Sequence, residues 1–340
     1  LQQTQEAGSI FINEVKNIVV TVVAATAVIQ GHMTLGMMLA VQYIIGQLNS
    51  PVEQLMNFFY SVQDVKISLE RINEIHQMDD ENGKDGLLTG LDHPEDGIHI
   101  SNIMFKYDPH ALRKTIDGVD ILIPQGKVTA IVGASGSGKT TLIRLMLGYY
   151  PVLEGKITIG DTDINQLNRK WWRRQCGVVM QEGVIFSESI KRNIAVDDAE
   201  IDEARLMRAA EIACIKDYVM ALPLKFNTKI GRDGVGLSQG QKQRILIARA
   251  VYKNPDYIFL DEATNSLDAN NERNIVENLD KFYQGKTVVI VAHRLSTVKN
   301  ADQIVVLDQG KVVEIGNHES LTAKRGAYYN LVKNQLELGN

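Results

Sequence analysis

The chain has 340 residues, a formal net charge of -5 at pH 7 and 44% hydrophobic residues. This length and hydrophobic content are enough for more than one packed unit. The negative charge argues against a nucleic-acid-binding protein, so no nucleic-acid partner is expected. Cys176 and Cys214 lie far apart in the sequence and form no metal or redox spacing, which indicates small buried residues in a reducing compartment.

The first segment is strongly apolar. The stretch Asn17–Val52 contains no Asp, Glu, Lys or Arg, and only the polar, Gly-containing stretch Gln30–Thr34 interrupts it. This pattern predicts a hairpin of two membrane helices. Each arm is short against the ~20 apolar residues that cross a bilayer, so a pair of buried core helices in a soluble protein is the alternative. The chain begins at Leu1 within a helical pattern, and we therefore expect it to be part of a longer protein.

A helical pattern continues beyond the hairpin. Apolar residues recur at helical spacing from Val52 to Ile75 with charges on the opposite face, which predicts a membrane helix extended into the cytosol. The polar stretch Met78–Pro94 carries glycines and an acidic run and is typical of a linker. These patterns predict three parts, namely a membrane part over residues 1–77, a linker over 78–97 and a further domain over 98–340.

Residues 98–340 show a different pattern. Short alternating strands over 98–107, 119–123 and 156–159 give way to longer apolar strands that alternate with helices. This order predicts an α/β fold in which helices wrap a parallel sheet. The stretch Arg169–Arg174 holds two tryptophans among basic residues and predicts a short helix anchored to the core by its aromatic rings, with base stacking as the alternative.

One motif predicts chemistry most directly. Gly133–Thr140 reads GASGSGKT and fits the phosphate-binding pattern G-x-x-x-x-G-K-[ST]. An apolar strand over 128–132 leads into the motif and a helix over 141–147 leaves it, which is the context that the pattern requires. The sequence therefore predicts a P-loop.

Each residue of this loop has a defined task. The glycines allow backbone N–H groups to turn toward phosphate oxygens, and the helix N-terminus adds its positive dipole end. Lys139 is expected to reach the terminal phosphates and Thr140 to hold Mg²⁺. The loop residues expected to bind the nucleotide are Gly133, Ser135, Gly136, Gly138, Lys139 and Thr140.

Two adjacent carboxylates follow a second apolar strand. Tyr257–Leu260 is fully apolar and ends in Asp261 and Glu262. In an open α/β sheet, ligands lie at the carboxyl ends of the strands, so we expect this pair to face the glycine loop. Successive residues at a strand end point in different directions. Asp261 is therefore placed to hold Mg²⁺, and Glu262 to polarise a water for attack on the γ-phosphate.

The stretch Leu237–Gln241 precedes a helix over 242–252. Ser238 as the N-cap and Gln241 three residues later predict a capping box. The same helix N-terminus presents free N–H groups, which would also bind a phosphate. The two interpretations are compatible.

Together, these motifs resemble the nucleotide-binding domain of ATP-binding cassette (ABC) transporters over residues 98–336. The similarity lies in three stretches: residues 133–141 (Walker A), 257–261 (Walker B) and 237–241 (the signature LSGGQ, departing only at Gln239). The resemblance implies that Thr141 also binds nucleotide and that the signature contributes the Ser238 side chain and the backbone at Gly240.

Four further positions match the family pattern. The resemblance implies a role for each: Gln181 touches Mg²⁺ and water, His293 contacts the γ-phosphate, Asp268 belongs to the D-loop Ser266-Leu267-Asp268, and Tyr107 stacks its ring on adenine. Phe105, two residues from Tyr107 on the same face of the expected strand, is the alternative for the last role. Catalytic roles therefore fall to Glu262, His293 and Gln181.

The family implies a function for the whole chain. ATP and Mg²⁺ are the expected cofactors, and the expected activity is ATP hydrolysis that drives export across a membrane by a homodimer of ABC subunits. Residues 1–77 resemble, less specifically, the last two membrane helices of an exporter subunit. The signature variant and Asn49–Leu55 resemble peptide or bacteriocin exporters.

The expected location is the cell membrane, as a multi-pass protein with the ATPase domain in the cytoplasm. A soluble ABC-type ATPase with a role outside transport, or export of lipid or small hydrophobic compounds, are the alternatives. The substrate itself is not identified by these residues, because other helices of an exporter contact it.

Overall fold

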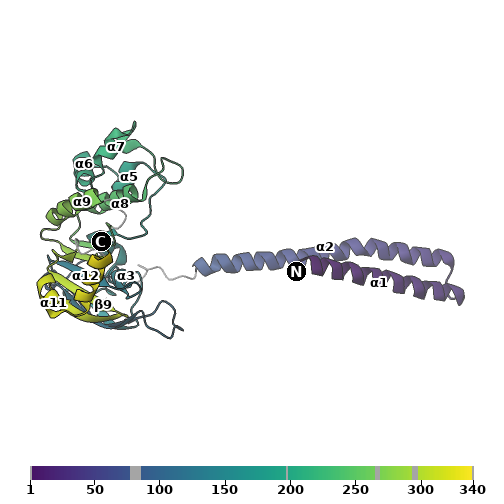
Figure 1. Cartoon of the computed structure of the whole chain (residues 1–340). Coiled ribbons are helices and arrows are strands. Elements are labelled where there is room, and N and C mark those ends of the chain that lie inside the picture. The colour runs from purple at the N-terminus through teal and green to yellow at the C-terminus, as the bar shows by residue number, and fades with distance from the viewer. Residues whose placement is uncertain (1, 77–85, 197, 265–268, 293–297, 339–340) are drawn as a thin grey trace. The chain divides into compact units, whose positions relative to one another are not determined.

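The computed structural model describes residues 2–76, 86–196, 198–264, 269–292 and 298–338. The chain divides into two compact units, Leu1–Asp80 and Glu81–Asn340 (Figure 1).

The first unit is a hairpin of two long helices. Helix α1 spans Gln2–Ile29 and helix α2 spans Leu35–His76, so the turn lies at the predicted polar stretch 30–34. Helix α2 continues without a break through Pro51, as the apolar spacing predicted.

Polar contacts join the two helices of the hairpin. Lys16 Nζ donates to Asn49 Oδ1 at 2.6 Å, and Gln42 Nε2 donates to Thr21 Oγ1 at 3.2 Å. In the part of the chain that the structure describes, Phe11–Ile29 is the one helical stretch long and apolar enough to cross a membrane, by length and composition, and only 6% of it is buried. The apolar surface of α1 is thus largely exposed within its own unit.

The second unit contains a small antiparallel sheet and a larger mixed sheet in its described residues. The small sheet has the strand order β2-β1-β4-β5 and consists of β1 (Ile98–Phe105), β2 (Ile116–Ile123), β4 (Glu154–Ile159) and β5 (Thr162–Asp163). The six-stranded sheet has the order β10-β9-β3-β8-β7-β6 and consists of β3 (Val128–Gly133), β6 (Cys176–Val179), β7 (Tyr257–Asp261), β8 (Thr287–Val291), β9 (Gln303–Asp308) and β10 (Lys311–Gly316).

The larger sheet is parallel except at one edge, where β10 returns antiparallel to β9. Every residue of β7 and β8 is buried, which explains why these strands are continuous apolar runs and not alternating ones. The α/β fold class expected from the sequence is confirmed.

The second unit also contains helices. They are α3 (Lys139–Met146), α4 (Arg169–Gln175), α5 (Ile190–Ile194), α6 (Glu203–Ile212), α7 (Lys216–Ala221), α8 (Gln239–Lys253), α9 (Ala269–Phe282), α11 (His318–Lys324) and α12 (Ala327–Leu338), with short 3₁₀ turns at Pro94–Asp96 and Lys225–Asn227. Figure 1 shows α5, α6, α7 and α8 gathered at one end of this unit, and α11 and α12 beside the sheets at the other.

The second unit has two hydrophobic cores, and strand β3 contributes to both. Ala130 and Val132 belong to the core that the larger sheet shares with α5, α6 and α8, whereas Ile131 belongs to the core between the two sheets. This division follows from the alternation of side chains along a strand. Helix α3 lies in the second of these cores through residues such as Leu142 and Leu145.

Part of the segment expected to be a linker packs on the second unit. Leu88 N donates to Gln166 O at 2.8 Å, and Asn168 N donates to Leu88 O at 2.9 Å. Asp92 N donates to the Thr162 hydroxyl at 3.0 Å. Residues from Leu88 onward are therefore paired with this unit through their backbone, a long-range contact that composition alone does not reveal.

Candidate active site

The glycine loop lies between β3 and α3, in the predicted context. Gly133 has φ 156° and Gly138 has φ 102°, a region that side chains rarely adopt. A Cβ on Gly133 would clash with the Leu307 carbonyl oxygen, and one on Gly138 would lie 2.7 Å from Ile116 Cδ1. Glycine is therefore required at both positions by conformation and by space.

The glycine loop is held by the β9–β10 turn, and the helix that follows it has no side-chain cap. Gly310 N, in the β9–β10 turn, donates to Ser137 O at 3.1 Å. No side chain caps the N-terminus of α3, whose N-cap is Gly138. Since the first N–H groups of a helix need acceptors, this terminus is suited to bind phosphate oxygens.

Lys139 lies inside this loop. Its side chain is buried, and its Nζ donates to Gly133 O and Ala134 O at 2.9 Å each. Burial lowers the pKa of the Lys139 ammonium, while the nearby Glu262 and Asp261 carboxylates oppose that shift. The ammonium is thus held inside the loop by two of the loop's own carbonyls.

The structure brings the two expected Mg²⁺ ligands together. The Thr140 hydroxyl donates to Asp261 Oδ1 at 3.1 Å, across 121 residues of sequence. Asp261 is buried, and within the described chain its Oδ2 has no hydrogen-bond partner. Burial raises the pKa of Asp261, and the Thr140 hydrogen bond opposes the shift.

These donors fit a magnesium ion. A hydroxyl oxygen and a carboxylate oxygen are the hard ligands that Mg²⁺ prefers, and the ion usually takes only one or two protein carboxylates together with water and substrate phosphates. Consistent with such a sparse site, the described residues contain no cluster of three or more His, Cys, Asp or Glu side chains that could hold a metal alone. The unpartnered Asp261 Oδ2 would be the carboxylate oxygen that binds the ion.

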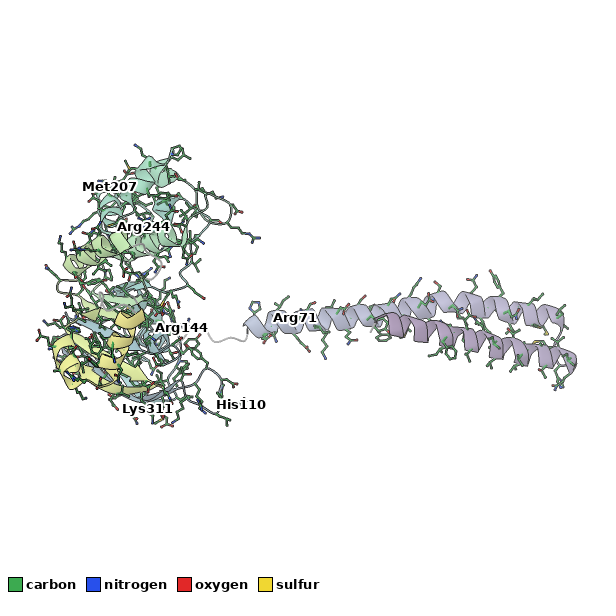
Figure 2. The ribbon with its side chains drawn as sticks, in the orientation of Figure 1. Arg71, His110, Arg144, Met207, Arg244 and Lys311 are labelled. Carbon is green, nitrogen blue, oxygen red and sulfur yellow. The ribbon has the colours of Figure 1, made fainter. Side chains whose placement is uncertain are left out.

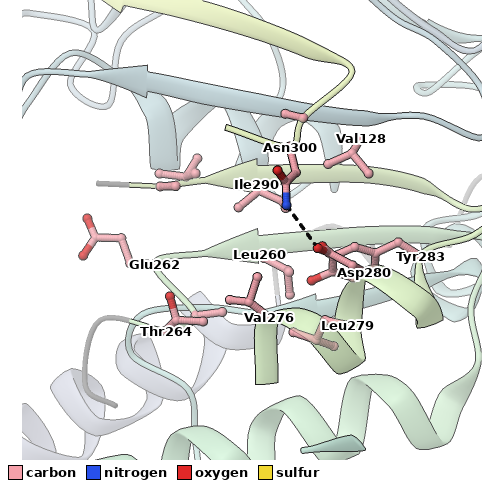
Figure 3. Close-up of a pocket in the computed structure, with 14 residues that line it drawn as sticks. Val128, Leu260, Glu262, Thr264, Val276, Leu279, Asp280, Tyr283, Ile290 and Asn300 are labelled. Carbon is pink, nitrogen blue, oxygen red and sulfur yellow. Dashed lines mark hydrogen bonds between the residues drawn. The ribbon is translucent and has the colours of Figure 1, made fainter. Parts of the chain in front are cut away.

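Glu262 follows Asp261 in an unusual backbone conformation. Its φ is 52°, which costs energy for a residue with a side chain, and its N–H donates to Val291 O at 3.0 Å. Figure 3 shows its carboxylate at the end of β7, pointing away from the apolar side chains of Val276 and Leu279. The strained turn thus directs Glu262 out of the core, while Asp261 stays in it.

An apolar cavity lies beside this turn (Figure 3). It is lined mostly by the ends of β7 and β8, by α9 and by residues just before β9, and Asn300 Nδ2 donates to Asp280 Oδ2 at 3.5 Å at its wall. None of the residues 133–141 lines it. Glu262 does line it, so the cavity adjoins the turn that carries the expected general base.

Of the remaining predicted residues, Gln181 is described and two are not. Gln181 is exposed and follows β6, which pairs with β7 so that Val179 lies opposite Leu260. It is therefore at the same sheet edge as Asp261. His293 and Asp268 lie outside the described residues, as does the rest of the expected D-loop.

The predicted capping box is present at the start of α8. Gln241 N donates to the Ser238 hydroxyl at 3.2 Å, and Ser238 N donates to Gln241 Oε1 at 2.8 Å. Ser238 is exposed, and Gly240 lies in the first turn. Helix α8 packs mainly on α5, α6 and β6, whereas α3 packs mainly on β3, β7 and β8.

Tyr107 and Phe105 are now distinguished. Strand β1 ends at Phe105, and not at Tyr107 as expected, so the two residues do not share a strand face. Phe105 is 4% exposed and Tyr107 is 47% exposed. Phe105 is thus a core residue, and Tyr107 is the one accessible to a ligand.

Two neighbours of Tyr107 were not predicted. Arg144 Nη1 donates to the Tyr107 hydroxyl at 3.3 Å, and the Tyr150 ring meets the Tyr107 ring at 5.3 Å between centroids. The available sequence signal was the position of Arg144 one turn after Thr141 on the same helix. Nothing in the sequence indicated that Tyr107 would lie above that turn.

Comparisons with known proteins agree with this geometry. The ABC transporter family matches over residues 116–265. The leukotoxin translocation ATP-binding protein LktB of Mannheimia haemolytica is 39% identical over 314 residues, 92% of this chain and 44% of LktB, and LktB of Bibersteinia trehalosi is equally similar. A solved bacterial Atm1-family ABC exporter with ATP bound is 30% identical with a TM-score of 0.76, and the match covers 98% of this chain and 60% of that one.

Proposed function

Because the chain belongs to the ABC transporter family, we propose that it binds ATP with Mg²⁺ at the glycine loop and hydrolyses it to drive export across a membrane. ATP-binding proteins of this family hydrolyse ATP to drive transport. The chain spans less than half the length of LktB, so the activity of the complete protein belongs to this proposal.

The contact between Thr140 and Asp261 is the observation that carries the proposal. It joins the start of the phosphate-binding helix to the strand end at 3.1 Å and leaves a buried carboxylate oxygen open to a cation. Lys139 and the loop N–H groups would hold the phosphates, and Thr140, Asp261 and Gln181 would hold Mg²⁺. Glu262 would act as general base on the attacking water.

The membrane part of the proposal rests on the first unit. We propose that the hairpin lies in the cell membrane as part of a multi-pass domain, with the ATPase domain in the cytoplasm. The exposed apolar stretch Phe11–Ile29 supports this placement. The translocation role in the name of LktB, together with the resemblance to peptide exporters, supports a peptide-like substrate.

Nucleotide binding by the full chain in detergent tests the proposal. Wild type should bind ATP and release phosphate in the presence of Mg²⁺, and Lys139→Ala should weaken both binding and turnover, since the ammonium contacts phosphates in the ground and transition states. Lys170→Ala, on the exposed side of α4, is the matched control and should behave as wild type. Failure of the wild-type chain to bind ATP, or equal binding by Lys139→Ala, would refute the proposal.

A further inference from the structure

The Tyr107 hydroxyl links the expected base-binding residue to the phosphate-binding helix. It lies 3.1 Å from Thr141 Oγ1 and accepts a hydrogen bond from Arg144 Nη1 at 3.3 Å. Thr141 and Arg144 are three residues apart on α3 and therefore share one face of the helix. One hydroxyl thus bridges a single turn of the helix that begins at Lys139.

The chemistry of the guanidinium fixes the direction of one of these hydrogen bonds. A guanidinium has only donors, so Arg144 must donate and the Tyr107 oxygen must accept. In the hydrogen bond between Tyr107 and Thr141, either hydroxyl can be the donor. The hydrogen bond to Tyr107 raises the pKa of the Arg144 guanidinium, so the donor stays charged. Figure 2 shows Arg144 on the side of the unit from which the loop with His110 projects.

The Tyr107 ring is held at its sides and remains accessible. Phe105 and Tyr150 meet it at interplanar angles of 85° and 88°, so neither lies parallel to it. Nearly half of the residue, 47%, is exposed. Two perpendicular rings and two hydrogen bonds to the hydroxyl leave the Tyr107 side chain little rotational freedom. A ring that is already fixed in place loses less entropy when a base stacks on it.

Resting on the proposed function, we propose that Arg144 is a positioning residue for the nucleotide base. It holds the Tyr107 hydroxyl against α3 and so fixes the ring at a set place relative to the phosphate loop. Adenine affinity then depends on the hydroxyl as well as on the ring. The sequence alone predicted only that the Tyr107 ring stacks on adenine. In that case Tyr107→Phe would bind ATP with nearly wild-type affinity.

Binding of two ligands tests the proposal in the full chain. ATP carries both a base and phosphates, whereas inorganic tripolyphosphate carries only phosphates. Tyr107→Phe and Arg144→Met should each weaken ATP binding about 3- to 10-fold, the effect of one or two hydrogen bonds, and leave tripolyphosphate binding unchanged. In the Tyr107→Phe background, Arg144→Met should have no further effect, because the hydroxyl it bonds is already gone.

Tripolyphosphate binding also shows that each variant keeps a folded loop. Arg144→Lys retains a donor and should therefore bind ATP more tightly than Arg144→Met. Tyr149→Phe removes a hydroxyl from a neighbouring exposed tyrosine, serves as the matched control and should have no effect. Wild-type affinity for ATP in Tyr107→Phe, or equal weakening of both ligands in Arg144→Met, would overturn the inference while the ATPase proposal stands. A wild-type chain that binds neither ligand would instead refute the ATPase proposal.

Discussion

Glu262 combines a costly backbone conformation with an acidic side chain at the strand end. Its φ of 52° separates it from the buried Asp261, so that two adjacent carboxylates occupy different environments. Such strain persists only where the surrounding structure imposes it, and it concentrates at functional sites. The conformation therefore supports separate roles for the two residues.

Glu262→Gln tests the base role with almost no change of shape. We expect phosphate release to fall by ~10²–10⁴ while ATP binding stays near wild type, since only the proton acceptor is lost. Single-turnover phosphate release and equilibrium ATP binding measure the two effects. Glu188→Gln on the exposed surface is the control. Hydrolysis by Glu262→Gln at the parent rate would assign the base to another residue.

Asp261 provides a prediction about stability. A carboxyl whose folded pKa is raised contributes stability that is present below its unfolded pKa and is lost as pH rises through the folded pKa. At pH 7 and without nucleotide, the buried charge therefore costs stability, and Asp261→Asn should unfold at equal or higher denaturant concentration than wild type. This advantage should shrink toward pH 4, and Mg²⁺-dependent turnover should be lost. A stability difference between Asp261→Asn and wild type that favours the variant more at pH 4 than at pH 7 would contradict this account.

At the scale of elements, α4 holds the far end of the phosphate-binding helix. Trp172 Nε1 donates to Met146 O at 2.9 Å, and Arg173 donates to Leu147 O at 3.3 Å and to Gly148 O at 3.2 Å. Met146 is the last residue of α3 and Leu147 its C-cap, so their carbonyls have no N–H partner within the helix. Since α4 runs directly into β6, the P-loop helix and the strand before Gln181 are connected.

Replacement of the two neighbouring tryptophans measures this connection. Trp172 is fully buried, whereas Trp171 is partly buried. Trp172→Phe should lower the free energy of unfolding by about 1–3 kcal/mol, because it leaves the buried Met146 carbonyl without its donor. Trp171→Phe should cost less. Chemical denaturation of both variants compares them, and equal losses would show that the hydrogen bond contributes nothing.

The elements also show what the sequence could and could not predict. The P-loop, the strand ending at Asp261 and the capping box at Ser238 were predictable, because each depends on local spacing. The end of β1 and the pairing of Leu88 with residues 166–168 were not, because they depend on contacts between segments far apart in sequence. The same applies to Arg144, whose partner is 37 residues away.

At the scale of the whole molecule, the starts of α3 and α8 indicate how a complete site would form. Each helix start is suited to bind phosphate, yet they contact different elements of one chain. We propose that two chains associate head to tail, so that Ser238 of one subunit closes over the nucleotide held by Lys139 of the other. Symmetry then supplies two equal sites.

Linked dimers decide between shared and separate sites. With Lys139→Ala in one subunit and Ser238→Arg in the other, a shared geometry places both lesions in one site and leaves the second intact. With both substitutions in one subunit, each shared site is damaged. We therefore expect higher ATP turnover from the first arrangement. Higher turnover from the second would show that each subunit works alone.

Strand β3 gives alternate side chains to two separate cores and then becomes the phosphate loop. Neither core can shift relative to the other without a force on the backbone that surrounds the phosphates. On the proposed function, nucleotide binding at this loop would then be coupled to the relative position of the two cores. A ligand that is small compared with the domain can in this way bias the arrangement of the whole unit, without touching most of it.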